Sequence, residues 1–200
     1  MLDGVMRARL DPLLNALGRG LARRGIGANQ ITVLGLALGL GAAGMIALGL
    51  PWALIPLLVG RVADGLDGAV ARVQGKTDFG GYLDIVCDFI FYGAIPLAFA
   101  LRDPANALAA AFLLTSFYTN GASFLAFAIL AEKRGMTSTA RGEKSLYFTA
   151  GLLEGTETIA FFVAICLWPQ AFSGLAYGFG ALCFVTAAAR VMLAARQFGG

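Results

Sequence analysis

Six apolar segments, each long enough to cross the hydrocarbon core of a membrane, dominate this sequence of 200 residues. A helix rises about 1.5 Å per residue, so about 20 apolar residues cross a core of roughly 30 Å. The segments lie near residues 31–50, 52–72, 80–101, 106–131, 145–168 and 172–194. Short polar or Pro/Gly-containing breaks separate them and leave no room for a soluble domain. The pattern predicts an all-α, polytopic integral membrane protein with six transmembrane helices in a single domain.

The composition supports this class and excludes several functions. Hydrophobic residues make up 58% of the chain and charged residues 14%, which is more apolar surface than one soluble core of this size can hide. The net charge of +3 is small and its basic residues are dispersed, so we expect contacts with membrane lipids and no nucleic acid. The absence of histidine excludes His-based acid/base catalysis and His-ligated zinc. Cys87, Cys166 and Cys183 lie inside apolar runs, which is typical of small buried hydrophobic residues.

Residues 5–24, ahead of the first apolar segment, alternate apolar positions with arginines. This alternation predicts an amphipathic helix within residues 1–28 that lies in the membrane interface, with the six-helix bundle following over residues 29–200. The basic positions continue up to the first span, which differs from the pattern of a cleaved signal peptide.

The basic residues at the ends of the apolar segments also predict an orientation. All except Arg102 fall on one side of the membrane: the N-terminal arginines, Lys76, Lys133, Arg134, Arg141, Lys144 and Arg196. Because short loops rich in lysine and arginine stay in the cytoplasm, we expect a multi-pass protein of the cell inner membrane with both termini on the cytoplasmic side.

Two stripes of acidic and small residues flank a polar turn over residues 73–79. The first stripe consists of Asp64, Asp67, Gly68, Ala71 and Arg72, and the second of Gly80, Asp84 and Asp88. Spacings of three, four, seven and eight residues place each stripe on one face of a helix. The turn folds the two helices antiparallel, so we expect the stripes to face each other near the cytoplasmic membrane surface.

Charge and chemistry favour a ligand site over simple packing. Carboxylates are costly in hydrocarbon, and the cationic side chains of Arg61 and Arg72 leave an excess of negative charge. A cluster of carboxylates without Cys or His suits hard ions such as Mg²⁺, Mn²⁺ or Ca²⁺, and two such ions can clamp a diphosphate. The small residues of the stripes permit close approach of a phosphate, and Arg72 can neutralise one or hold an aspartate.

The spacing D64-x2-D67-G68-x2-A71-R72, followed by G80-x3-D84-x3-D88, resembles the motif of the CDP-alcohol phosphotransferase (CDP-alcohol phosphatidyltransferase) family. The six-span pattern with an interfacial N-terminal helix is similar to that family as well. Seven residues separate Arg72 from Gly80 where the family motif has eight. We expect this shorter turn to alter its own contacts and to spare the two helical stripes.

The resemblance implies transfer of a substituted phosphate, typically phosphatidyl from CDP-diacylglycerol, to the hydroxyl of a small polar alcohol, with release of CMP in phospholipid biosynthesis. It implies that Asp64, Asp67 and Asp84 bind two ions, Mg²⁺ or Mn²⁺, and that Asp88 is the general base and touches the second ion. The CDP pocket would be lined by Gly68, Ala71, Arg72 and Gly80. The family also implies a homodimer, and it leaves the identity of the acceptor alcohol open.

Polar residues outside the motif have two interpretations each. The run Asn29-Gln30-Ile31-Thr32 either caps the first transmembrane helix through Asn29 or Thr32, or approaches the cytidine ring. Arg141 and Lys144 either bind an anionic acceptor or anchor the loop at the membrane surface.

The fourth and fifth spans carry further polar residues. Glu154 and Glu157 either form the wall of the acceptor pocket or pair with basic residues such as Arg190. On the fourth span we expect Tyr118, Asn120 and Ser123 to make hydrogen bonds between helices.

Two other classes of protein could use intramembrane carboxylates. A divalent cation transporter would spread its ligands through the membrane midplane, whereas here they cluster toward one face and the first and sixth spans contain no acidic residue. An aspartate-rich prenyltransferase would carry paired aspartate runs, which this sequence lacks. A transferase acting on a CDP-linked donor fits the pattern best.

Overall fold

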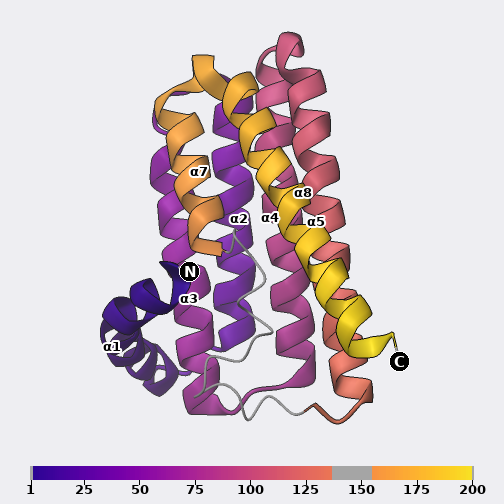
Figure 1. Cartoon of the computed structure of the whole chain (residues 1–200). Helices are drawn as coiled ribbons and strands as arrows, with labels where there is room; N and C mark the ends of the chain where they lie inside the picture. Colours follow the sequence, from indigo (N-terminus) through magenta and orange to yellow (C-terminus); the bar gives the residue numbers. More distant parts are fainter. Residues whose placement is uncertain (1, 137–154, 200) are drawn as a thin grey trace.

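The computed structural model of the protein describes residues 2–136 and 155–199, and every regular element in these ranges is helical (Figure 1). The long helices are α1 (Leu2–Arg23), α2 (Ala28–Ala47), α3 (Leu54–Gln74), α4 (Asp78–Arg102), α5 (Ala107–Lys133), α7 (Gly155–Leu167) and α8 (Phe172–Phe198). Short 3-10 turns over Pro104–Asn106 and Pro169–Ala171 precede α5 and α8. The prediction of an all-α fold is confirmed for the described residues.

Within the described residues, four helical stretches are long and apolar enough to cross a membrane: α2, α4, α5 with its preceding turn, and α8 with its preceding turn. α3 has 21 residues but carries Arg61, Asp64, Asp67 and Arg72, so its composition is less apolar than that of the other four. α7 is apolar and has 13 residues within the described part of the chain. The count of six spans therefore remains a prediction.

α2 lies between α3 and α4 and packs against both of them (Figure 1). α5 packs against α4 and α8, and α1 lies along α3. Aromatic side chains fill the core between these helices. Phe99 and Phe172 stack with ring centroids 4.5 Å apart, and Phe91 meets the edge of Phe162 at 5.5 Å. All four of these rings are essentially inaccessible to solvent.

Large apolar side chains also cover the outside of the bundle. Leu34, Val59, Leu97, Ile129 and Val185 each expose about half or more of their surface, and they lie on five different helices. A soluble protein of this size rarely exposes large apolar side chains on so many helices, whereas a surface in contact with lipid tails requires them. The outer surface therefore agrees with the apolar spans.

The helix α1 (Leu2–Arg23) lies within the N-terminal segment for which an amphipathic helix is predicted, and its amphipathic character remains a prediction. A Cβ atom on Gly18 would lie 2.7 Å from the Cβ of Ala69, so the absence of a side chain there lets α1 approach α3 closely. Leu10, Leu13 and Leu17, which share one face of the helix, are exposed. Placement of α1 in the membrane interface remains a prediction.

Three residues join α3 to α4. α3 ends at Gln74, where Gly75 adopts φ of 97° and so reverses the chain in a conformation that favours glycine. Thr77 is the N-cap of α4, and its hydroxyl accepts a 3.0 Å hydrogen bond from the backbone N–H of Gly80. The predicted polar turn over 73–79 is thus shorter than expected, because both helices continue into it.

Candidate active site

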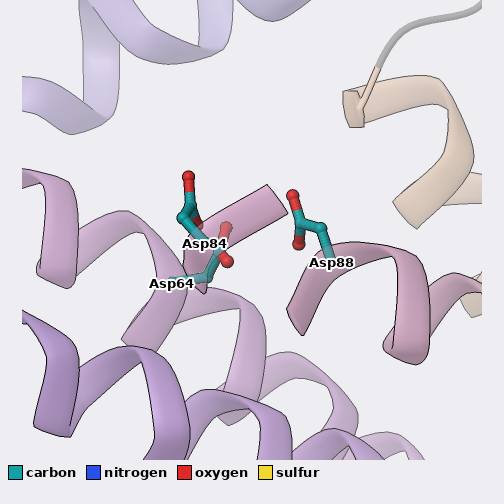
Figure 2. A group of neighbouring side chains, drawn as sticks. All are labelled: Asp64, Asp84 and Asp88. Atoms are coloured by element: carbon teal, nitrogen blue, oxygen red, sulfur yellow. The ribbon is translucent and has the colours of Figure 1, made fainter. Parts of the chain in front are cut away.

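Three of the predicted carboxylates converge between α3 and α4, about two to three helical turns from the connection between these helices. Asp64 lies on α3, Asp84 and Asp88 lie on α4, and one carboxylate oxygen from each lies within 4.8 Å of the others (Figure 2). The four-residue spacing of Asp84 and Asp88 places both on one face of α4. The two stripes therefore meet through these residues, as the helical spacing predicts.

Asp67, the fourth predicted ligand, has a different environment. It is 7% exposed, and its Oδ2 accepts a 2.5 Å hydrogen bond from the hydroxyl of Thr32 on α2. Among the described residues it lies outside the group of three carboxylates. The assignment of Asp67 as a metal ligand remains a prediction, and the bond to Thr32 leaves Oδ1 as the oxygen for that role.

Arg61 also belongs to this cluster, although its charge was expected only to compensate the carboxylates and it was not predicted as a site residue. Its Nη1 donates a 2.9 Å hydrogen bond to Asp88 Oδ1 and lies 3.5 Å from Asp64 Oδ1. The side chain is only 11% exposed. Its position three residues before Asp64, on the same helical face, is the sequence signal that could have identified it.

Arg72 lies at the solvent side of the site, in an exposed position. Its Nε and Nη2 donate hydrogen bonds of 3.1 and 2.8 Å to Oδ1 of Asn15 on α1. Among the described residues, the nearest atom to a Cβ built on Gly68 is Arg72 Nη1 at 3.6 Å. Gly68 thus faces open space beside the guanidinium, which suits a pocket wall. The sequence gives no periodic signal for Asn15, because its role depends on how α1 packs.

Gly80 is a point of close approach between helices. A Cβ there would lie 3.0 Å from Thr77 Oγ1 and 3.2 Å from Oδ1 of Asn29, which belongs to the first turn of α2. The glycine therefore lets the start of α2 approach the start of α4. Asn29 lies next to the motif, in agreement with the interpretation that places it near the cytidine ring.

The alternative interpretation, in which Asn29 or Thr32 caps α2, is wrong. Gly27 is the N-cap, and its backbone N–H donates a 2.9 Å hydrogen bond to Gln30 Oε1. Thr32 instead lies one turn further into α2, where its hydroxyl bonds to Asp67. The Thr32 hydroxyl is used in this contact with the buried Asp67, and not as a cap of the helix.

On α5, two of the three predicted interhelical residues are confirmed. Arg190 Nη1 on α8 donates to Asn120 Oδ1 at 2.9 Å, to Asn120 O at 3.0 Å and to Ser123 Oγ at 2.7 Å. Tyr118, in contrast, is 76% exposed on the outer surface.

The predicted acceptor residues are covered only in part by the structure. Glu157 lies in the first turn of α7 and is half-buried. Glu154, Arg141 and Lys144 lie outside the described residues.

The donor set fits a hard divalent cation. Three carboxylates so close to one another repel strongly unless cations lie among them, and Arg61 supplies only one positive charge. Mg²⁺ and Mn²⁺ prefer oxygen ligands at about 2.1 Å, so ligand oxygens around one ion are up to roughly 4.2 Å apart. Small rotations of the carboxylates bring the present separations into that range.

The helices and the acidic site together define a helical membrane protein with a carboxylate centre between α3 and α4. The model of the CDP-alcohol phosphatidyltransferase family matches residues 26–195. This chain belongs to the CDP-alcohol phosphatidyltransferase family.

Two relatives of known sequence match the chain. The chain is 46% identical over 195 residues to the inner membrane protein YnjF of Escherichia coli (strain K12), covering 96% of this chain and 94% of that protein. It is 36% identical over 103 residues to the archaetidylinositol phosphate synthase of Pyrococcus horikoshii, covering 48% of this chain and 52% of the relative.

Solved structures of the same fold include phosphatidylinositol phosphate synthase PgsA1 of Mycobacterium tuberculosis. Its complex with manganese and citrate has a TM-score of 0.69 and 25% identity, covering 90% of this chain and 87% of that chain. Its complex with CDP-DAG has a TM-score of 0.66 and 23% identity, covering 90% and 92%.

Proposed function

We propose that this protein transfers the phosphatidyl group of CDP-diacylglycerol to the hydroxyl of a small polar alcohol and releases CMP, as a step of phospholipid synthesis. The observation that carries the proposal is the convergence of Asp64, Asp84 and Asp88, on the family's motif, to within 4.8 Å. A pair of divalent ions held by carboxylates binds the oxygens of a diphosphate, because these oxygens are hard anionic ligands. The PgsA1 structure that contains CDP-DAG supports such a donor.

Asp64, Asp84 and Asp88 would hold two Mg²⁺ or Mn²⁺ ions, with Asp67 contributing through Oδ1. When bound, the ions neutralise the diphosphate and stabilise the charge that develops on its oxygens. The fit of the three carboxylates and the manganese complex of PgsA1 support this assignment. Asp67 is buried and its Oδ2 bonds Thr32, so the proposal assigns its Oδ1 to the ion.

Asp88 is the proposed general base. The acceptor hydroxyl oxygen forms a bond to the phosphorus that carries the diacylglycerol, and the bond from that phosphorus to the bridging oxygen breaks. Its electron pair leaves with CMP, and the hydroxyl proton passes to Asp88. Arg61 bonds Asp88 through Oδ1, so Oδ2 is the oxygen that can accept the proton. Positioned proton transfer of this kind typically contributes about 10²–10⁴-fold in rate.

Gly68, Ala71, Arg72 and Gly80 are the proposed lining of the CDP pocket. Gly68 faces open space beside the Arg72 guanidinium, which can bind a phosphate bidentately. Asn29, close to Gly80, supplies an amide that can pair with the edge of the cytosine ring. These four motif positions and Asn29 come from three helices that meet at the α3–α4 turn.

The acceptor, the membrane and the oligomer belong to the same proposal. Because PgsA1 and the Pyrococcus relative are both named for inositol phosphate transfer, inositol phosphate is the first acceptor to test. We propose a multi-pass protein of the inner membrane, and the name of its relative, inner membrane protein YnjF, supports this location. Both termini and the site would face the cytoplasm. A homodimer is proposed by analogy with the family.

The test is CMP release by purified protein supplied with CDP-diacylglycerol, Mg²⁺ or Mn²⁺, and a panel of alcohols: inositol phosphate, glycerol 3-phosphate, serine and choline. We expect release with one acceptor and loss of at least about 10²-fold in the Asp84→Asn variant, whose melting temperature without metal should stay close to that of the metal-free native protein. Asp78→Asn, at an exposed position in the first turn of α4, is the matched control and should retain turnover. Full turnover by Asp84→Asn would refute the proposal.

A further inference from the structure

Arg61 is an unusual residue to find among metal-binding carboxylates, because its charge has the same sign as that of the ions. Its guanidinium contacts Asp88 and Asp64 and is nearly buried. Its Nε is buried without a hydrogen-bond partner among the described residues. A buried donor that goes unsatisfied carries a free-energy cost, so the position of this side chain requires another source of stabilisation.

Phe91 supplies that stabilisation. The Arg61 guanidinium carbon lies 3.9 Å from the centre of the Phe91 ring, which is the geometry of a cation–π contact. Phe91 is fully buried, and its ring is so close to α2 that a Cβ on Gly39 would lie 2.6 Å from it. On another side it meets Phe162 of α7. The ring is therefore fixed by two helices, and it holds the guanidinium in the cluster.

The fixed positive charge changes how many ions the site can accept. Asp64, Asp84 and Asp88 carry three negative charges when ionised, and Arg61 offsets one of them. One divalent ion neutralises the remainder. If the buried Asp67 is counted as well, one ion leaves a single negative charge, and a second ion creates an excess of positive charge. The Asp64 and Asp88 side chains are 34% and 30% exposed, whereas the Arg61 side chain beside them is only 11% exposed. A second ion close to this fixed cation is therefore repelled, and an incoming diphosphate offsets the excess of positive charge.

We propose that Arg61 is a positioning residue that holds Asp88 and sets the metal occupancy, so that the free protein binds one divalent ion and takes up the second only together with a diphosphate. This inference rests on the proposed function, since it takes the acidic cluster as the metal site. It explains why a cation fixed on an aromatic ring lies against the proposed base. It also gives the order of binding, with the second ion and the nucleotide entering as a neutralising pair.

The test is a titration with Mn²⁺ alone, followed by electron paramagnetic resonance of the free ion, on purified full-length protein with and without CDP. A protein-free titration with CDP corrects for Mn²⁺ bound by the nucleotide. We expect the native protein to bind one Mn²⁺ per chain without CDP and two with it. Arg61→Met should bind two without CDP, and its first ion should bind about tenfold more tightly or better, because a nearby like charge is gone.

Two further variants separate charge from shape and from general effects. Arg61→Lys keeps the charge and should retain one ion without CDP, whereas loss of the planar fork lowers its turnover. Arg134 donates hydrogen bonds to the backbone carbonyls of Gln197 and Phe198, and its guanidinium lies 5.1 Å from the centre of the Phe198 ring, at the ends of α5 and α8. Arg134→Gln should therefore bind Mn²⁺ as the native protein does.

The outcomes distinguish the inference from the proposed function. Two ions bound by the native protein without CDP would overturn the role of Arg61 and leave the proposed function intact, and this arm needs no variant to fold. An unchanged single ion in folded Arg61→Met would overturn it in the same way. Failure of the native protein to bind Mn²⁺ under either condition would overturn the proposed function itself.

Discussion

Thr32 on α2 donates a hydrogen bond to Asp67 on α3, between two side chains that are 6% and 7% exposed. The bond joins residues 35 positions apart and ties the central helix to the motif helix. A carboxylate buried this deeply depends on each polar contact that it makes, because water cannot replace a lost one.

Replacing Thr32 by Val should therefore destabilise the protein. The change keeps the shape and removes the donor, and hydrogen bonds to charged groups are worth about 1.5–3 kcal/mol. Thermal unfolding in detergent should show the loss, and turnover should fall because Asp67 is free to rotate. Thr32→Ser, which keeps the hydroxyl, should retain most of both. Equal melting temperatures for Val and Ser variants would show that the hydrogen bond contributes nothing.

The three clustered carboxylates predict a large effect of metal on stability. An ion that binds only the folded protein stabilises it by about 2.7 kcal/mol when supplied at about 100 times its Kd. Adding Mn²⁺ to chelator-treated protein should raise its melting temperature, and Asp84→Asn should lose most of the rise. EDTA should abolish CMP release, with recovery on addition of Mg²⁺ or Mn²⁺. A metal-induced rise that is equal in Asp84→Asn would contradict the assignment of this cluster.

The close contact between Gly39 and the Phe91 ring predicts that a larger residue at position 39 destabilises the protein. In Gly39→Ala the new Cβ meets the ring at 2.6 Å, and the ring has no room to move because it is fully buried. Overpacking of this kind costs about 1–3 kcal/mol, and displacement of the ring should also disturb Arg61. The measurement is thermal unfolding together with the Mn²⁺ titration.

Gly44 on the same helix is the control for that change. A Cβ there meets no described atom within 4 Å, so Gly44→Ala should stabilise α2 by about 0.5–1 kcal/mol. A Gly39→Ala variant as stable as Gly44→Ala would show that the contact with Phe91 relaxes without cost.

Asn15 predicts a role for α1 in donor binding. Asn15→Ala removes the acceptor of both Arg72 hydrogen bonds, so the exposed guanidinium gains freedom and must be ordered again when the phosphate binds. We expect the KM for CDP-diacylglycerol to rise several-fold with little change in melting temperature. Gly20→Ala, at an exposed position on the same helix with open space around it, should leave the KM unchanged. An unaltered KM in Asn15→Ala would show that Arg72 needs no support from α1.

The meeting of Asp64 with Asp84 and Asp88 could be predicted from sequence, because helical spacing and a short turn are local properties. The apolar segments likewise predicted the helices that the structure describes, with shifts at their ends. The pattern could not separate Asp67 from the other three, since its burial depends on how α2 packs against α3.

Residues outside the motif show the same limit more clearly. Arg61 has an obvious position on the helical face, but its contact with Phe91 depends on the packing of α2, α4 and α7. Asn15 reaches Arg72 only because Gly18 lets α1 approach Ala69 closely. The interpretation of Thr32 as a cap of α2 fails for a related reason, because its hydroxyl bonds Asp67, 35 positions away in the sequence.

The three-residue connection between α3 and α4 has a further consequence. So short a link, closed by Gly75 and capped by Thr77, prevents the two acid-bearing helices from sliding past each other independently. The carboxylates are therefore pre-organised before any ion arrives, and ion entry requires side-chain rotation and no rearrangement of the backbone. Uptake of an ion at this centre therefore does not depend on movement of α3 against α4.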